Sequence, residues 1–389
     1  MQQAYILKAV RTPGCRANRG KFANLRPDYL GIVALKGLLD KTGVDPQDIE
    51  DVIVGCSFPE AEQGMNVGRM IVLGAGLPYQ IPGQTVNRFC SSGLQSISMA
   101  AERIMAGFAD CIVAGGVESM TRVPMGGNKF AANPDLISDW PEAYASMGIT
   151  AEKVADKYGI TRQEQDEFGL ESNRRAAKAI KEGKFKEEII PVEVQRTRVV
   201  NGELRKDTEL VDIDDGPRES TLEKMAKLKT PFKQNGSVTA GNSSQMTDGA
   251  AFTLVVSEEF LKKAKLDPMA RFAGYDVKGV PPELMGIGPS EAIPGLLKKS
   301  GLKAEDIDLV ELNEAFASQA IYCMNKVGLD RELVNVNGGA IALGHPLGCT
   351  GAKLTTTLLH ELERRDLKRG LVSMCIGGGM GAAGLFVRD

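Results

Sequence analysis

Two stretches far apart in the chain share one order of apolar and polar positions. Residues 34–55 read ALKGLLDKTGVDPQDIEDVIVG and residues 292–313 read AIPGLLKKSGLKAEDIDLVELN; they align without a gap at an offset of 258, with nine of the 22 positions identical. In each, apolar residues spaced along one helix face come first, and a glycine and a polar turn then lead into an apolar run. Each stretch therefore predicts a helix with a glycine C-cap and a following buried strand.

The same offset relates a second pair of segments. TVNRFCSSGLQ (85–95) and NVNGGAIALGHPLGCTGAK (335–353) each open a helix, with Gly93 matching Gly351. Apolar runs with glycine ends follow both helices, DCIVAGG in the first case and LVSMCIGGG in the second. Two matches at one offset predict an α/β protein made of two halves related by duplication, with helices packed against mostly parallel strands. A chance match of a common helix-strand pattern is the alternative.

Residues 118–247 have a different character, with helical, charge-rich stretches and no third copy of the repeat. An insertion of this size in an α/β scaffold usually serves binding. We therefore predict a first half formed by residues 1–117 plus 248–268, an inserted loop domain at 118–247, and a second half at 269–389.

Composition narrows the class of protein. The 389 residues are 43% hydrophobic and 25% charged with a net charge of -3, which is typical of a soluble globular protein without a basic field for nucleic acid. No run of 18 apolar residues occurs and the N-terminal apolar run is too short for a secretory signal, so we expect a cytoplasmic protein. Seven cysteines without a CxxC spacing argue against a disulfide framework and a zinc site.

Cys90 and His345 are the first candidates for chemistry. A thiol just before a helix meets the positive end of the helix dipole and unpaired N–H groups, which favour a thiolate and can receive an oxyanion; a buried, inert cysteine is the alternative. Only two histidines are present. His345 lies in a glycine-rich turn that mirrors Cys90 in the other half, and is thus a candidate base, whereas His360 resembles an ordinary helix residue.

Two further motifs end apolar runs. Cys375 enters the glycine run of MCIGGGMGAAG (374–384), whose N–H groups suit an anion nest. A phosphate loop is a weaker interpretation, since no GKS or GKT follows. Asn313 and Glu314 follow the second repeated strand, where open α/β sheets build their sites; Glu314 alone is also compatible with a simple helix-start acid.

Together these motifs identify the chain as resembling the thiolase family over nearly its whole length. NRFCSSGLQ, AGGVESM, TAGNSSQMTDGAA, NEAFA, GGAIALGHPLGCTG and CIGGGMGAA occur in the family's order and spacing. The segments DDGPRESTLEKMAKLKTPFKQNGSVTAGNSSQ and PPELMGIGPSEAIP most resemble the degradative 3-oxoacyl-CoA (3-ketoacyl-CoA) thiolases, or acetyl-CoA C-acyltransferases. The resemblance implies a thiolase fold, with βαβαβαββ halves in an αβαβα layered arrangement and a loop domain that holds CoA.

The resemblance also implies roles for five residues. Cys90 would attack the keto group of a 3-oxoacyl-CoA after His345 takes its proton, and Cys375 would protonate the acetyl-CoA enolate that leaves. His345 and a water held by Asn313 would bind the enolate oxygen. The N–H groups of Cys90 and Gly377 would bind the carbonyl oxygen of the acyl-Cys90 thioester.

By the same resemblance CoA is a substrate, and neither a cofactor nor a metal is expected. Its contacts would be Met147, Arg218, Ala240, Ser244, Ala315 and Phe316, with lysines of EKMAKLK near its phosphates. The family suggests a homodimer or homotetramer, and the multifunctional β-oxidation enzyme as a partner.

Two departures from the family pattern bear on specificity. Ser146 stands where short-chain acetoacetyl-CoA thiolases have a histidine, which favours longer or varied acyl chains. Cys349 stands where many relatives have alanine, and we interpret it as a packing residue. An acetoacetyl-CoA thiolase that condenses two acetyl-CoA is the main alternative. A non-catalytic acyl-CoA or lipid carrier is disfavoured by the intact cysteines and histidine, and a 3-oxoacyl synthase by Cys375 at the third catalytic position.

Overall fold

Each half of the chain builds the same succession of strands and helices. The computed structural model describes residues 2–200 and 203–388. The first half contains β1 (Ala4–Arg11), α1 (Pro27–Thr42), β3 (Asp51–Gly55), α2 (Val67–Gly74), β4 (Gln84–Val86), α3 (Ser92–Met105), β5 (Cys111–Ser119) and β8 (Thr247–Ser257). The second contains β9 (Ala270–Gly279), α9 (Gly288–Ser300), β10 (Leu309–Leu312), α10 (Ala317–Val327), α12 (Leu347–Arg365), β11 (Arg369–Ile376) and β12 (Met380–Val387). The predicted βαβαβαββ order is confirmed in the first half; in the second, its third strand is reduced to a bridge between Val310 and Val334.

The repeated sequence segments have one local structure. Helix α1 ends at Gly43 with φ 66°, and α9 ends at Gly301 with φ 67°. A left-handed residue at this position closes a helix with least strain when it is glycine. A single 3₁₀ turn follows each glycine and leads into β3 or β10. The helix, C-cap and strand predicted from the pattern are therefore confirmed in both copies.

The strands of the two halves form one mixed sheet, in the order β10-β11-β12-β9-β1-β8-β5-β3-β4. Strands β3, β4 and β5 are parallel to each other, as are β10 and β11, whereas β8, β1, β12 and β9 pair antiparallel. The expectation of mostly parallel strands was wrong, because the last two strands of each half return as antiparallel neighbours. Only two residue pairs join β1 to β9, where the halves meet.

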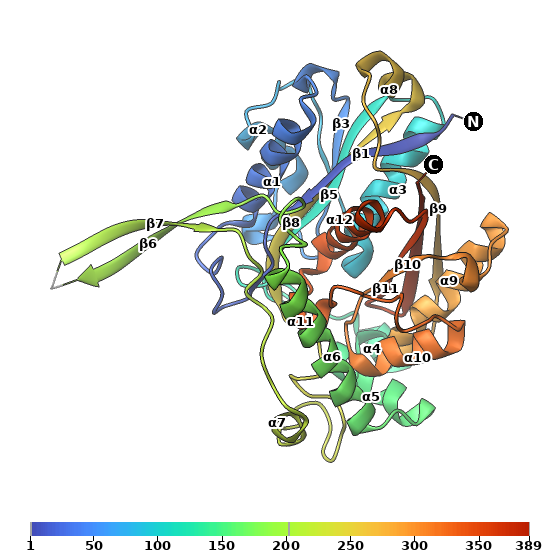
Figure 1. Cartoon of the computed structure of the whole chain (residues 1–389). Coiled ribbons are helices and arrows are strands. Elements are labelled where there is room, and N and C mark those ends of the chain that lie inside the picture. The colour runs from blue at the N-terminus through green and yellow to red at the C-terminus, as the bar shows by residue number, and fades with distance from the viewer. Residues whose placement is uncertain (1, 201–202, 389) are drawn as a thin grey trace.

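Three apolar clusters show the αβαβα layering. Along β3, Val52 and Val54 pack with α1 and α2, whereas Ile53 packs with α3 and α12. Along β11, Leu371 packs with α9 and α10, whereas Val372 packs with α3 and α12. Alternate residues of one strand face opposite sides of the sheet. Helices α3 and α12 therefore form the central layer, enclosed by the two halves of the sheet (Figure 1).

The two central helices approach each other most closely at matching glycines. A methyl group at Gly93 would lie 2.7 Å from the backbone nitrogen of Ala352, and one at Gly351 would overlap the backbone nitrogen of Leu94. Each glycine thus permits backbone contact with the helix of the other half. The duplication places the starts of both helices at one interface, as the sequence predicts.

The segment between β5 and β8 supplies α4 (Pro134–Asp139), α5 (Met147–Tyr158), α6 (Arg162–Lys181), β6 (Val192–Val200), β7 (Glu203–Val211) and α7 (Leu222–Ala226). Helices α5 and α6 lie beside α10 and α11 (Ala340–Leu343), and the β6–β7 hairpin, which the sequence did not predict, projects from the body (Figure 1). The remaining elements are β2 (Cys15–Arg16) and α8 (Glu258–Ala264). Within the described part of the chain, no helix combines the length and apolar character needed to span a bilayer.

We predict that Gly351→Ala lowers the free energy of unfolding by about 1–3 kcal/mol, because its methyl group meets backbone that cannot rotate away. Urea titration followed by circular dichroism measures this change. Gly279→Ala is the control, since no atom lies within 4 Å of a methyl group there. Equal stability of the two variants would contradict the close helix contact.

Candidate active site

Cys90 lies in a short 3₁₀ turn, Phe89–Ser91, that runs directly into α3. Phe89 adopts φ 41°, which is uncommon for a non-glycine residue and costs about 1–3 kcal/mol. Its N–H donates to Asn87 Oδ1 at 2.8 Å. Ser92 Oγ accepts from the N–H of Arg88 at 2.8 Å and donates to the carbonyl of Phe89 at 2.7 Å. These contacts hold the strained turn that presents the thiol, so Ser92 supports the backbone.

The Cys90 thiol is 8% exposed and its pKa is raised to about 11, chiefly by burial. Hydrogen bonds from the N–H groups of Gly377 and of Cys90 itself lower the pKa, and the charge of Glu118 raises it. The expected preference for thiolate at the helix start is therefore outweighed by desolvation in the resting protein. The family resemblance assigns the same two N–H groups to the carbonyl oxygen of an acyl-Cys90 thioester, and here both are hydrogen-bonded to the Cys90 sulfur.

His345 is held from three elements. Its Nδ1 lies 2.6 Å from Thr350 Oγ1 on α12, its Nε2 lies 3.3 Å from Asn313 Nδ2 at the end of β10, and its N–H donates to the carbonyl of Gln245 at 3.0 Å. Leu347, two residues further on, packs in one cluster with Cys90. The structure thus brings the two predicted groups to facing helix starts. Burial lowers the pKa of His345 to about 3, with a further contribution from Lys353, so the imidazole is neutral and able to accept a proton.

Asn313 follows β10, where its N–H donates to the carbonyl of Ser373 on β11 at 2.8 Å. Its Oδ1 is buried and has no hydrogen-bond partner among the described residues. A buried amide oxygen is costly to leave unpaired. Beside the His345 ring, this atom is suited to accept a hydrogen bond from a bound molecule.

Cys375 is the penultimate residue of β11 and is fully buried, which raises its pKa well above the usual value. Charge on Cys90 raises it further, so the two sulfur atoms lie within electrostatic reach of each other. Gly377 follows, and a methyl group there would lie 3.6 Å from the ring of Phe89 and 3.8 Å from Met147 Sδ. The glycine run therefore reaches Cys90 beside Met147.

The residues predicted to contact CoA form two adjoining groups. Met147, Ala315 and Phe316 pack in one apolar cluster with Cys375. The N–H of Ser244 donates to the carbonyl of Ala315 at 2.9 Å, which attaches the TAGNSS segment to this cluster. A cavity of about 160 Å³ adjoins the same segment and is lined by Asn173, Arg218, Glu219, Ser220, Met225, Leu228, Ala240, Gly241, Gln245 and Ile341. The lysines of EKMAKLK lie on the exposed surface next to this region.

Three orienting residues were not assigned a role from the sequence. Glu118 accepts N–H bonds from Ser57 and Gly348, both at 2.8 Å, and so links the end of β5 to the start of α12. Thr350 fixes the His345 ring and Gln245 fixes its backbone. Glu118 lies within the motif AGGVESM, near the end of β5, but its partners come from distant segments that the motif does not reveal.

Three other residues considered from the sequence make contacts that support the fold: Glu314, His360 and Cys349. Glu314 is buried and accepts from Ser172 Oγ at 2.6 Å and from Asn335 Nδ2 at 2.9 Å, so it is more than a helix-start acid. His360 Nε2 lies 3.1 Å from the carbonyl of Ala9. Cys349 is buried in the central core between the sheet halves, as a packing residue would be.

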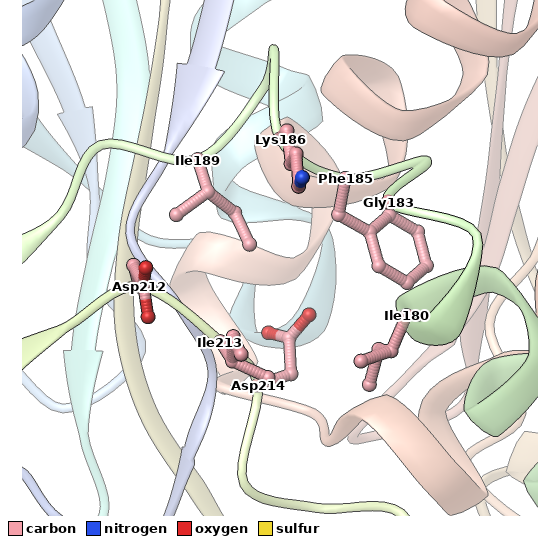
Figure 2. Close-up of a pocket in the computed structure, with 8 residues that line it drawn as sticks. All are labelled: Ile180, Gly183, Phe185, Lys186, Ile189, Asp212, Ile213 and Asp214. Carbon is pink, nitrogen blue, oxygen red and sulfur yellow. The ribbon is translucent and has the colours of Figure 1, made fainter.

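A separate pocket of about 100 Å³ lies between the end of α6 and the chain around the base of the hairpin (Figure 2). Its lining residues are Ile180, Gly183, Phe185, Lys186, Ile189, Asp212, Ile213 and Asp214. None of the predicted site residues lines it. The Asp214 carboxylate, drawn in Figure 2, accepts from both terminal nitrogens of Arg11, at 2.8 and 2.9 Å. This pocket therefore borders a buried ion pair and lies apart from Cys90.

Comparison with known proteins gives one consistent result. The chain matches the family description "Thiolase, N-terminal domain" over residues 4–259 and "Thiolase, C-terminal domain" over residues 266–388. It is 53% identical to the 3-ketoacyl-CoA thiolase of Bacillus subtilis (strain 168), with 99% of each chain covered. It is 47% identical to the peroxisomal 3-ketoacyl-CoA thiolase 5 of Arabidopsis thaliana, covering 98% of this chain and 85% of the relative. The crystal structure of the Bacillus anthracis acetyl-CoA acetyltransferase superposes with a TM-score of 0.91 at 40% identity, covering 100% of this chain and 99% of the other.

The lowered pKa of His345 predicts a specific acid sensitivity. The folded protein keeps the ring neutral to about pH 3, whereas the unfolded chain protonates it near pH 6.5. The unfolded state therefore gains protons first, and folding stability falls as pH drops below 6.5, by about 1.4 kcal/mol per pH unit. His345→Gln should reduce this slope between pH 6.5 and 4.5 in urea titrations, whereas His360 remains in both proteins. Identical slopes would contradict a neutral, buried His345.

Proposed function

Since this chain belongs to the thiolase family, we propose that it is a 3-ketoacyl-CoA thiolase, an acyltransferase that cleaves 3-oxoacyl-CoA with CoA to acyl-CoA and acetyl-CoA in fatty acid β-oxidation. The observation that carries the proposal is the arrangement at the two facing helix starts. There the Cys90 thiol receives the N–H of Gly377, and a neutral His345 is fixed by Thr350 and Asn313. A nucleophile, a base and preorganised donors meet in one buried site.

The first half of the reaction makes a covalent acyl-enzyme. The Cys90 S–H bond breaks as its proton passes to His345, and the sulfur attacks the keto carbon of the substrate. The bond between the α-carbon and the keto carbon then breaks, leaving the acyl group on Cys90 and an acetyl-CoA enolate. The α-carbon takes a proton from Cys375, whose charge interaction with Cys90 supports a place beside the reacting atoms. Dividing the cleavage through a thioester lowers each barrier.

The second half returns the enzyme to its starting state. CoA gives its thiol proton to the Cys375 thiolate, and the CoA sulfur attacks the acyl-Cys90 carbonyl. The Cys90 sulfur leaves and regains its proton from His345. Both steps place negative charge on oxygen, so each needs donors held in advance. Gly377 and Cys90 N–H groups would serve the thioester oxygen, and His345 with a water held by Asn313 would serve the enolate oxygen.

We assign CoA to the inserted segment and its border with the second half. Two features support a path for pantetheine toward the sulfur atoms of Cys90 and Cys375. One is the cavity lined by Arg218 and Ala240, and the other is the apolar cluster that contains Met147 and Cys375. This assignment retains the proposed division into a first half (1–117 plus 248–268), a loop domain (118–247) and a second half (269–389).

An acetoacetyl-CoA thiolase that condenses two acetyl-CoA is the second candidate, and the 40% identical acetyl-CoA acetyltransferase of known structure favours it. Against it stands Ser146, which is exposed and directly precedes Met147. A serine there leaves more room for an acyl tail than a histidine does. We therefore favour an enzyme for longer or varied acyl chains.

Our proposal includes the oligomeric state, the location and the partner of the enzyme. We propose a homodimer or homotetramer in the cytoplasm, working beside the multifunctional β-oxidation enzyme. Exposed apolar side chains on α2 and the loops around it, among them Met65, Leu73 and Tyr79, support a protein interface on that side of the first half.

We predict that incubation with acyl-CoA adds one acyl mass to the Cys90 peptide in the native enzyme and in Cys375→Ala, and none in Cys90→Ser. Acylation needs Cys90 as nucleophile, whereas Cys375 acts on the enolate. Cys375→Ala should also lose exchange of the acetyl α-proton with solvent deuterium, measured by NMR. Binding of CoA by Cys90→Ser, measured by calorimetry, is the control for an intact site. An unmodified Cys90 peptide in the native enzyme would exclude the acyl-enzyme, and retained exchange in Cys375→Ala would remove Cys375 from the reaction.

We predict thiolytic cleavage of 3-oxoacyl-CoA substrates longer than four carbons. A chain-length series followed by loss of substrate absorbance gives kcat/KM for each member. Ser146→His should lower kcat/KM for long chains more than for the four-carbon substrate, because the larger ring narrows the entry beside Met147. Activity confined to the four-carbon substrate would favour the acetoacetyl-CoA thiolase.

A further inference from the structure

Lys353 is a buried cation that the mechanism above leaves without a role. It lies on α12 and is 5% exposed. Its Nζ donates to the carbonyl of Leu343 at 2.6 Å and to the carbonyl of Gly344 at 3.0 Å. These two residues end the short helix α11 and directly precede His345. A side chain of the central helix thus holds the backbone turn that carries the proposed base.

This turn depends on such a partner. Gly344 has φ 84° and closes α11, whose last carbonyls lack partners inside the helix. An ammonium satisfies two of these oxygens at once and places a positive charge at the negative end of α11. The backbone before His345 is thereby fixed from the same helix that fixes its ring through Thr350.

The positive charge of Lys353 is not cancelled locally. Among the described residues, no carboxylate lies within ion-pair distance of its Nζ. The two acids whose charges act on Lys353 are already paired with Arg11, Asp214 through both terminal nitrogens and Glu188 through Nε at 2.6 Å. The charged or titratable groups that act on Lys353 from the surrounding elements are Asp214, Arg11, Cys349 and Glu188. Its charge in turn lowers the pKa values of Glu311, Cys349 and His345.

We propose that Lys353 is a positioning residue for the reaction, which holds the Leu343–Gly344 turn and keeps His345 neutral until substrate arrives. The inference rests on the proposed function of His345 as base. It assigns Lys353 an electrostatic role through His345 and no contact with substrate.

The balance of charges during proton transfer explains why Lys353 affects His345. When the Cys90 proton moves to His345, one S–H bond is exchanged for one N–H bond, and a thiolate and an imidazolium replace two neutral groups. An imidazolium near the Lys353 ammonium is a like-charge pair in a buried site, and this repulsion opposes the transfer of the Cys90 proton to His345. The resting pair therefore stays neutral, and the imidazolium returns its proton readily once the sulfur leaves the acyl group. Lys353 itself has a pKa lowered to about 8 by burial, so it is mostly charged at pH 7.

The test uses the rate at which iodoacetamide alkylates Cys90, followed by mass spectrometry of its peptide at pH 6 and pH 9.5. Lys353→Gln retains a donor for the turn and removes the charge. Since His345 then becomes more basic, the ion pair is more populated, and we expect alkylation at pH 6 to be about tenfold faster than in the native enzyme. At pH 9.5 the two rates should agree, because Lys353 has lost its own proton there. We also expect kcat to fall while KM for CoA is unchanged, since Lys353 contacts no substrate.

Two further variants separate charge from packing. Lys353→Arg retains the charge and should keep the native alkylation rate at pH 6. Thr356→Val removes a buried hydroxyl of the same helix, which donates to the carbonyl of Ala352 at 2.9 Å and is hydrogen-bonded neither to His345 nor to a group that acts on Lys353, so it should also keep the native rate at pH 6. Lys353→Met is a second neutral variant if Lys353→Gln does not fold. A native alkylation rate at pH 6 in both neutral variants, or an equal change in Thr356→Val, would overturn the proposal. Failure of the native enzyme to cleave any 3-oxoacyl-CoA would instead reject the proposed function, because the alkylation comparison needs no substrate.

Discussion

The contact between the starts of α3 and α12 is the constraint on which the site depends. Gly93 and Gly351 allow these helices to touch through their backbones, and any larger side chain would separate them. Because the two helices come from opposite halves, the contact brings Cys90 and His345 to one interface. The sheet halves enclose these two helices, and both groups are buried. A single steric requirement thereby sets both the meeting of the two groups and their burial.

Burial determines the resting protonation of this site. It raises the pKa of Cys90 to about 11 and lowers that of His345 to about 3, so each is neutral. Desolvation disfavours the charged form of either group. The surrounding donors, the N–H groups of Cys90 and Gly377, are nevertheless already aimed at the sulfur. These N–H groups are therefore already in place to stabilise negative charge on a substrate oxygen.

A layer of distant partners keeps the reacting groups in place. Glu118 links the end of β5 to the start of α12, and Glu314 ties β10 to α6 and the loop before His345. Gln245 reaches the backbone of His345 from the border of the inserted segment. The insertion therefore contributes both to the region proposed for CoA and to the geometry of His345, the proposed base. Rigid, satisfied hydrogen bonds of this kind fix a site more precisely than the loops alone can.

The local pattern of residues was sufficient to predict much of the fold and the main candidate site residues. Neighbouring residues were enough to predict the repeated helix, glycine C-cap and strand. They also predicted the helix starts at Cys90 and near His345, and the glycine run after Cys375. The layered arrangement of the fold came from the family motifs. Strand direction did not follow, because buried parallel and antiparallel strands have the same apolar runs. The β6–β7 hairpin was also missed, because β7 is exposed on both faces over most of its length and carries no hydrophobic alternation. Thr350, Glu118 and Lys353 acquire their importance only from partners brought close by folding. The sequence by itself determined which residues can do chemistry, and the tertiary structure alone decided their protonation, because desolvation and charge depend on what packs around them.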